Sequence, residues 1–119
     1  MRLRACHGRL RLELDAFRQG GDVLVRLSGG AAHVGAVALA APDSPPRVLT
    51  RPGHREDAVA LEIAERFSAA FQCAVCVCAG IHFEAITREE IHAVERMCRQ
   101  LAERCLARHA ARRHEEHAC

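Results

Sequence analysis

Three histidines stand beside glycines, each where an expected strand or helix begins or ends. They occur in Gly30-Ala31-Ala32-His33, in Gly53-His54 and in Gly80-Ile81-His82. If these points gather at one rim of a sheet, the imidazoles share a pocket, either a three-histidine metal site or a polar rim for an anionic ligand. The alternative is three unrelated capping or surface histidines, in a chain that has eight. Spacing alone leaves both interpretations open.

Other groups near these turns could add to binding. The Gly29-Gly30 turn and the start of the first expected helix could each bind a phosphate through backbone N–H groups. Arg51 and Arg55 flank that helix start and could add charge-assisted hydrogen bonds. Glu84, two residues beyond His82, could orient an imidazole or act as a general base, or it could be an exposed loop acid.

The cysteines do not predict a metal site. Seven cysteines without a secretory signal indicate reduced thiols in a cytosol. On a strand, Cys76 and Cys78 would share one face while Cys73 points to the other, so the three cannot converge on one ion. We expect structural buried thiols here, and also for Cys98 and Cys105 on the apolar stripe of the second helix.

Composition excludes several function classes. The net charge of +2 argues against a dedicated nucleic-acid binder. All 17 basic residues are arginine, so lysine Schiff-base chemistry has no side chain to use. No serine or cysteine stands in a recognisable nucleophile context, and no Walker or dinucleotide fingerprint occurs. No window approaches the ~20 apolar residues of a membrane span, so we expect a soluble, cytoplasmic protein.

The hydrophobic periodicity of the sequence predicts the strands and helices that must position these residues. Four strands are expected first, with the Gly29-Gly30 turn closing a hairpin between the second and third; they cover residues 9–15, 22–28, 33–40 and 47–50. A helix follows from about Glu56 to Ala70. Residues 73–79 form an unbroken apolar run, typical of a central strand that is covered on both faces. A second helix runs from a capping box at Thr87 to about Ala107.

This order, ββββαβα, predicts an α+β fold: a mostly antiparallel sheet of about five strands with both helices on one face. Residues 1–107 form a single domain and residues 108–119 a frayed C-terminal tail. The third expected strand has small side chains, and the first alternates apolar residues with exposed charged ones. Both features make a homodimer a reasonable expectation.

Three motifs in order also resemble a known family. They are GGxxHxG at residues 29–35, GHxE at residues 53–56, and GIHxE at residues 80–84 followed by TxEEI. Together they resemble the small D subunit of gallate-type phenolic-acid decarboxylases, the prenylated flavin chaperone LpdD-like family, over roughly Leu10 to Cys105. In that family the position of Glu84 is commonly Asp and an Asn follows it, where this chain has Ala85.

The resemblance implies a non-catalytic accessory protein that binds or hands over prenylated FMN for a UbiD-type decarboxylase. It also implies a fold similar to that of proteasome assembly chaperones, which are small dimerising α+β proteins. Carried over by motif, the cofactor-binding residues would be Gly29, Gly30, His33, Gly35, Gly53, His54, Glu56, Gly80, Ile81, His82 and Glu84.

Two alternatives remain open from the sequence. One is a metal-binding protein or enzyme that uses His33, His54 and His82 as ligands. The other is a plain assembly chaperone, which would bind a partner protein through the open face of the sheet and would bind no small molecule. In neither case do we expect nucleic acid or a membrane as a partner.

Overall fold

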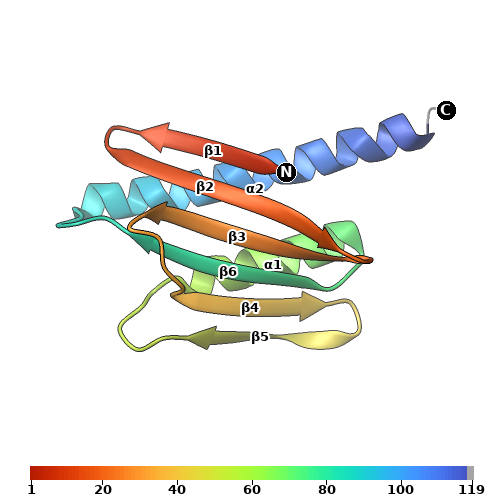
Figure 1. Cartoon of the computed structure of the whole chain (residues 1–119), viewed down its shortest axis with the longest axis horizontal. Helices are drawn as coiled ribbons and strands as arrows, with labels where there is room; N and C mark the ends of the chain where they lie inside the picture. Colours follow the sequence, from red (N-terminus) through yellow and green to blue (C-terminus); the bar gives the residue numbers. More distant parts are fainter. Residues whose placement is uncertain (118–119) are drawn as a thin grey trace.

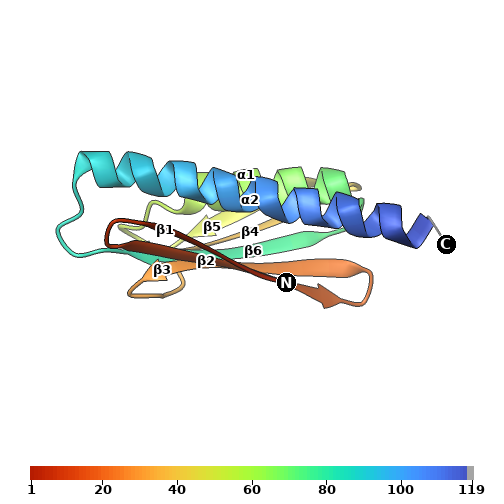
Figure 2. The same ribbon diagram turned by 90° about the horizontal axis from the view of Figure 1, so that it is seen from above.

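Six strands form one mixed sheet, and two helices cover one of its faces. The computed structural model describes residues 1–117. The elements are β1 (Arg2–His7), β2 (Leu10–Gln19), β3 (Asp22–Gly30), β4 (Ala36–Ala41), β5 (Ser44–Thr50), α1 (Asp57–Phe71), β6 (Val75–His82) and α2 (Arg88–His117). Across the sheet the strand order is β1-β2-β3-β6-β4-β5 (Figure 1). Seen from the edge, both helices lie on the same side, which confirms the predicted α+β class (Figure 2).

The sheet is mostly antiparallel, as predicted, because only the β3–β6 pairing is parallel among the described residues. It has six strands rather than about five. The additional strand is β1, which pairs with β2 from Arg2↔Asp15 to His7↔Leu10. β1 buries Leu3 under the helical layer while charged neighbours stay exposed. It therefore closes the sheet edge beside β2.

The hairpin predicted at Gly29-Gly30 is wrong. β6 lies between β3 and β4, and the two glycines continue β3 opposite Ile81 and His82. The chain then passes over the end of β6 in residues 31–35, which we call the crossover segment. There the Ala31 N–H donates to the His82 carbonyl at 2.9 Å, and the Gly35 N–H donates to the Ala79 carbonyl at 2.9 Å. Two adjacent glycines permit either a tight turn or this crossing, and their spacing does not distinguish them.

β6 is central in the sheet, as its apolar run predicts. Its side chains nevertheless alternate: Val75, Val77 and Ala79 are fully buried under the helices, whereas Cys76 and Cys78 are half-buried on the other face. Among residues 1–117, neither helix covers that second face, so the expectation of a strand covered on both faces is wrong. We call it the open sheet face.

The helices supply the rest of the core. α1 buries Ile63 and Phe67 among its apolar residues, and α2 buries Cys98, Leu101 and Cys105, so these two cysteines are structural as predicted. Burial raises the pKa of the Cys98 thiol to about 12. Among residues 1–117, neither helix is long and apolar enough to cross a membrane.

α2 is longer than predicted. It continues to His117, about ten residues past the expected end at Ala107, so residues 108–117 extend the helix instead of fraying. The His109 ring packs against Phe71 with ring centroids 4.2 Å apart. This contact ties the later part of α2 to the end of α1. The predicted fraying of Ala118 and Cys119 lies outside the described residues.

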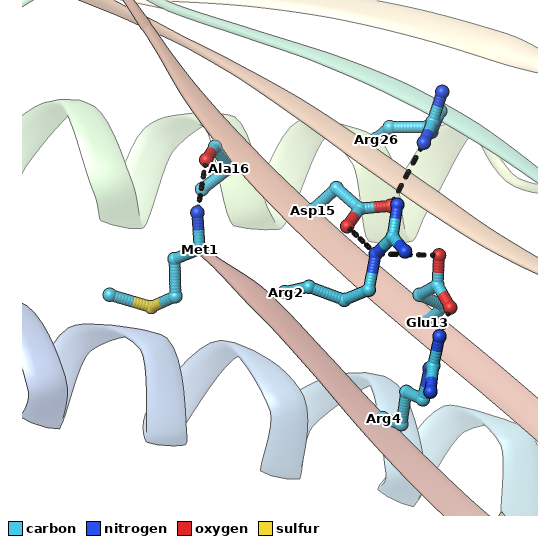
Figure 3. A network of polar contacts seen from close by, with 7 residues as sticks. All are labelled: Met1, Arg2, Arg4, Glu13, Asp15, Ala16 and Arg26. Atoms are coloured by element: carbon cyan, nitrogen blue, oxygen red, sulfur yellow. Dashed lines mark hydrogen bonds and ion pairs between the residues drawn. The ribbon is translucent and has the colours of Figure 1, made fainter.

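An ion-pair network covers the open sheet face over β1, β2 and β3 (Figure 3). The carboxylate of Asp15 accepts hydrogen bonds from Arg2 Nε at 2.6 Å and from Arg26 Nη2 at 3.1 Å. Glu13 pairs with Arg2 and Arg4 beside it. Burial raises the pKa of Asp15, but the hydrogen bonds from the two arginines outweigh it, so the pKa lies below its ordinary value. The network keeps a buried carboxylate ionised in the sheet.

The start of α2 is fixed by Thr87, Glu90 and Arg9. The predicted capping box is confirmed: the Glu90 N–H donates to Thr87 Oγ1 and the Thr87 N–H donates to Glu90 Oε1, both at 3.1 Å. Arg9, in the β1–β2 turn, donates to both carboxylate oxygens of Glu90 at 2.8 and 3.0 Å and to the Glu84 carbonyl at 2.8 Å. The hydrogen bond from Arg9 is the largest cause that lowers the pKa of Glu90 to about 2.

We predict that Glu90→Gln lowers stability most at neutral pH. A carboxylate whose pKa falls from 4.5 to about 2 on folding stabilises the fold above pH 4.5, and this contribution is lost as pH falls towards 2. The stability gap between wild type and variant should therefore close across that range. Urea unfolding at a series of pH values measures it, with Glu89→Gln, an exposed neighbour in the same helical turn, as the control. A gap that stays constant down to about pH 2 would contradict the prediction.

Candidate functional site

One large cavity lies where the crossover segment, the start of α1, the end of β6 and the start of α2 meet. Its volume is about 1180 Å³, and His33, His54 and His82 all contribute to its wall. The structure thus brings the three glycine-histidine turns to one place. The insertion of β6 between β3 and β4 is what carries His33 there, because the crossover segment must pass over the end of β6.

Two of the three histidines touch, and Glu56 completes a group with them. His33 Nε2 lies 3.1 Å from His54 Nδ1 and 3.1 Å from Glu56 Oε1. His54 Nδ1 lies 3.7 Å from Glu56 Oε2. The other ring nitrogen of His33 lies 3.0 Å from the Ala31 carbonyl. We call His33, His54 and Glu56 the His–His–Glu cluster.

His82 does not join this cluster, so the predicted three-histidine ligand set is not assembled. Its Nε2 lies instead 3.6 Å from Glu84 Oε2, and its side chain is 56% exposed. The third group beside the two imidazoles is Glu56, which the sequence indicated only as part of the GHxE motif. His82 is the last residue of β6, and its exposed side chain lies beside Glu84 of the following loop.

Glu56 is held in place by two backbone N–H groups. Ile81 N–H donates to Oε1 and Arg55 N–H donates to Oε2, each at 3.2 Å. Glu56 is the N-cap residue of α1, yet its side chain does not cap the helix. The Glu56 carboxylate contacts His33 and His54 instead. It lies near the positive end of the helix dipole, where a carboxylate is favoured.

Two motif glycines provide room for this arrangement. A Cβ at Gly35 would lie 2.6 Å from Cδ of Glu56, and a Cβ at Gly80 would overlap the carbonyl oxygen of His33. Close approach to backbone therefore requires glycine at position 80, whereas at Gly35 the neighbouring atoms are the end of the Glu56 side chain. Gly35 and Gly80 were predicted to bind the ligand. They lie behind the residues of the cavity wall and do not line the cavity themselves.

The phosphate site suggested at Gly29-Gly30 is not part of the main cavity. These glycines line a separate hollow beside β1 and β2. Gly30, with φ of +62°, lies against the His82 carbonyl, where a side chain would clash. Glu84 is 88% exposed, which fits the alternative of a loop acid. Ala85 adopts φ of +48°, a conformation that Asn tolerates better than Ala.

The start of α2 forms a further wall of the main cavity, of which the motifs indicated only Ile91, the last residue of TxEEI. Ile91 and Val94 contribute apolar surface there, and Arg99 contributes a cation. Ile91 is 39% exposed. On the α1 side, Arg51 and Arg55 line the cavity as predicted, beside the apolar Val59.

A comparison with models of known protein families shows which family the chain belongs to. The model described as the prenylated flavin chaperone LpdD-like domain matches residues 6–110. The chain belongs to the prenylated flavin chaperone LpdD-like family. No curated protein matches it. Each of the three motifs of the LpdD-like resemblance thus contributes residues to the wall of the main cavity, and two of them supply the His–His–Glu cluster.

We predict that Gly80→Ala destabilises the protein by about 1–3 kcal/mol, the cost of overpacking a filled site, and displaces His33. The new Cβ would meet backbone atoms of His33, which cannot rotate away. Gly21→Ala is the matched control, because a Cβ there meets nothing within 4 Å and Gly21 does not have a positive φ. Urea unfolding measures stability, and the NMR signals of the histidine rings report the displacement. Equal stability of the two variants would contradict the prediction.

Proposed function

We propose that this protein is a non-catalytic accessory protein that binds prenylated FMN in the main cavity and delivers it to a UbiD-type decarboxylase. The observation that carries the proposal is the meeting of all three family motifs at one cavity. A bound cofactor would supply its decarboxylation chemistry in the partner enzyme. The cavity itself offers binding groups, since its wall has no serine or threonine and its one cysteine, Cys98, is buried with a raised pKa.

The chemistry of the cavity wall suits a phosphorylated, partly apolar ligand. Its volume of about 1180 Å³ exceeds the ~300–1,000 Å³ of common ligand pockets. Val59, Ile91 and Val94 provide apolar surface for a ring system and a prenyl group. The first N–H groups of α1 have no partner within the helix, and Arg51 and Arg55 stand beside them. This corner would hold the phosphate.

The test of binding uses reduced prenylated FMN and the purified protein. We expect co-elution in gel filtration and a ligand absorbance in the protein peak. Arg55→Ala should weaken binding about 10- to 150-fold, since a charge-assisted hydrogen bond contributes about 1.5–3 kcal/mol. Arg66→Ala, which removes the same charge from α1 but does not line the cavity, is the matched control. No retention by the wild-type protein would overturn the proposal and favour a plain assembly chaperone.

Delivery is a separate step with its own readout. The protein loaded with reduced prenylated FMN should activate an apo UbiD-type decarboxylase faster than the same concentration of free cofactor. The Arg66→Ala protein should act like wild type in this assay. Equal activation by loaded protein and by free cofactor would remove the delivery role and leave binding intact.

We also propose that the protein forms a homodimer through the open sheet face. The register places Leu24, Cys76 and Leu39 in one row across β3, β6 and β4, and Phe17 extends the row on β2. Phe17, Leu24 and Leu39 are 46%, 39% and 51% exposed. Exposed apolar side chains gathered on one face are typical of a protein interface. A second copy would cover them.

We predict that Leu24→Asp reduces the mass in solution from dimer to monomer, because it buries a charge in the proposed interface. Ile91→Asp is the matched control: Ile91 has the same exposure of 39% but lies at the cavity wall on the helical side. Light scattering coupled to gel filtration measures both masses. A monomeric wild type, or a Leu24→Asp protein that remains a dimer, would contradict the prediction.

A further inference from the structure

The His–His–Glu cluster has the dimensions of a metal site. One ligand atom from each of His33, His54 and Glu56 lies within 4.8 Å of the others. His33 Nε2 lies 3.1 Å from both His54 Nδ1 and Glu56 Oε1, and His54 Nδ1 lies 3.7 Å from the other carboxylate oxygen, Glu56 Oε2. Around a tetrahedral zinc ion with bonds of ~2.0–2.1 Å, neighbouring ligand atoms are about 3.3–3.4 Å apart. The observed distances bracket that value.

The hydrogen bonding of His33 directs its second ring nitrogen towards the other two members of the cluster. The Ala31 carbonyl can only accept, so the Nδ1 of His33, 3.0 Å away, carries the hydrogen. The Nε2 is then the ring nitrogen that faces both His54 Nδ1 and Glu56 Oε1, each at 3.1 Å. An ion between the three side chains would meet this nitrogen, the His54 nitrogen and a carboxylate oxygen together.

The ligand atoms are oriented before any ion binds. A bond from the second ring nitrogen to a backbone carbonyl is the usual support of a metal-binding histidine. Glu56 is fixed by the N–H groups of Ile81 and Arg55. The side chains of His33, His54 and Glu56 are only 22%, 26% and 11% exposed. Little side-chain freedom therefore remains to be lost on binding.

We propose that His33, His54 and Glu56 bind one divalent transition-metal ion of the zinc type, with a fourth coordination position open to the main cavity. Two imidazoles and one carboxylate suit zinc and its neighbours better than magnesium or calcium, which prefer oxygen ligands. Three protein ligands plus one open position is the arrangement of zinc sites that bind a further molecule. All three residues line the cavity, so an oxygen of a cavity ligand can complete the coordination.

This inference is independent of the flavin proposal, because it rests on the cluster alone. It is tested with Zn²⁺ or Co²⁺ as the only added ligand. Untagged protein is kept reduced, since the chain has seven cysteines and further histidines on α2 that could bind metal elsewhere. Calorimetry should give one equivalent of Zn²⁺. The Co²⁺ spectrum should show ligand-field bands without thiolate charge-transfer absorption, which separates the cluster from cysteine sites.

Variants assign the ion to the cluster. His54→Ala and Glu56→Gln should each raise the Kd for Zn²⁺ at least tenfold, while Glu56→Gln keeps an oxygen that can accept from Ile81. His82→Ala is the matched control, because His82 lines the same cavity but lies outside the cluster. Zn²⁺ should raise the unfolding temperature of wild type and of His82→Ala, but not of Glu56→Gln.

Three results would overturn the proposal. They are the absence of stoichiometric Zn²⁺ binding by wild type, an unchanged Kd in both cluster variants, and an equal loss in His82→Ala. None of them affects retention of prenylated FMN in the absence of metal, so failure of this inference and failure of the proposed function are separate outcomes.

Discussion

The crossing of residues 31–35 over the end of β6 is the constraint on which the rest of the site depends. Because β6 lies between β3 and β4, the chain that leaves β3 must pass over it to begin β4. Hydrogen bonds from Ala31 to His82 and from Gly35 to Ala79 hold the crossing at both ends. The crossing is possible only where β6 has no side chain in the way, and Gly80 meets that condition. Gly80 thus determines where His33 can lie.

The other parts of the site converge on this crossing. α1 begins beside it, so the carboxylate at its N-cap, Glu56, reaches both the crossover segment and the end of β6. On the far side of the cavity, Arg9 holds Glu90 and thereby the start of α2. The cavity is therefore bounded by elements that are each anchored through polar contacts at their ends. Such a wall keeps its shape without a ligand, which lowers the entropy cost of binding.

Local features of the sequence predicted local structure well. The capping box at Thr87 and the central position of β6 are encoded within a few residues and are confirmed, although only one face of β6 is covered. Strand partners are not encoded in this way. Gly29-Gly30 is compatible with a hairpin and with a crossing, and only tertiary packing selects the second. The cluster followed the same rule: spacing suggested His82 as a ligand, but the tertiary structure places Glu56 beside His33 and His54 and leaves His82 beside Glu84.

Packing explains Gly80 but not the polar cluster. A Cβ at Gly80 would meet backbone atoms of His33, whereas a Cβ at Gly35 would meet only the carboxylate of Glu56, itself a member of the cluster. Three largely buried polar groups cost stability unless each finds a partner, and here the partners are one another, the Ala31 carbonyl and two backbone N–H groups. Apolar side chains of similar volume could support the crossing without this requirement. The fold alone therefore does not account for the cluster, whereas the proposed role in binding would.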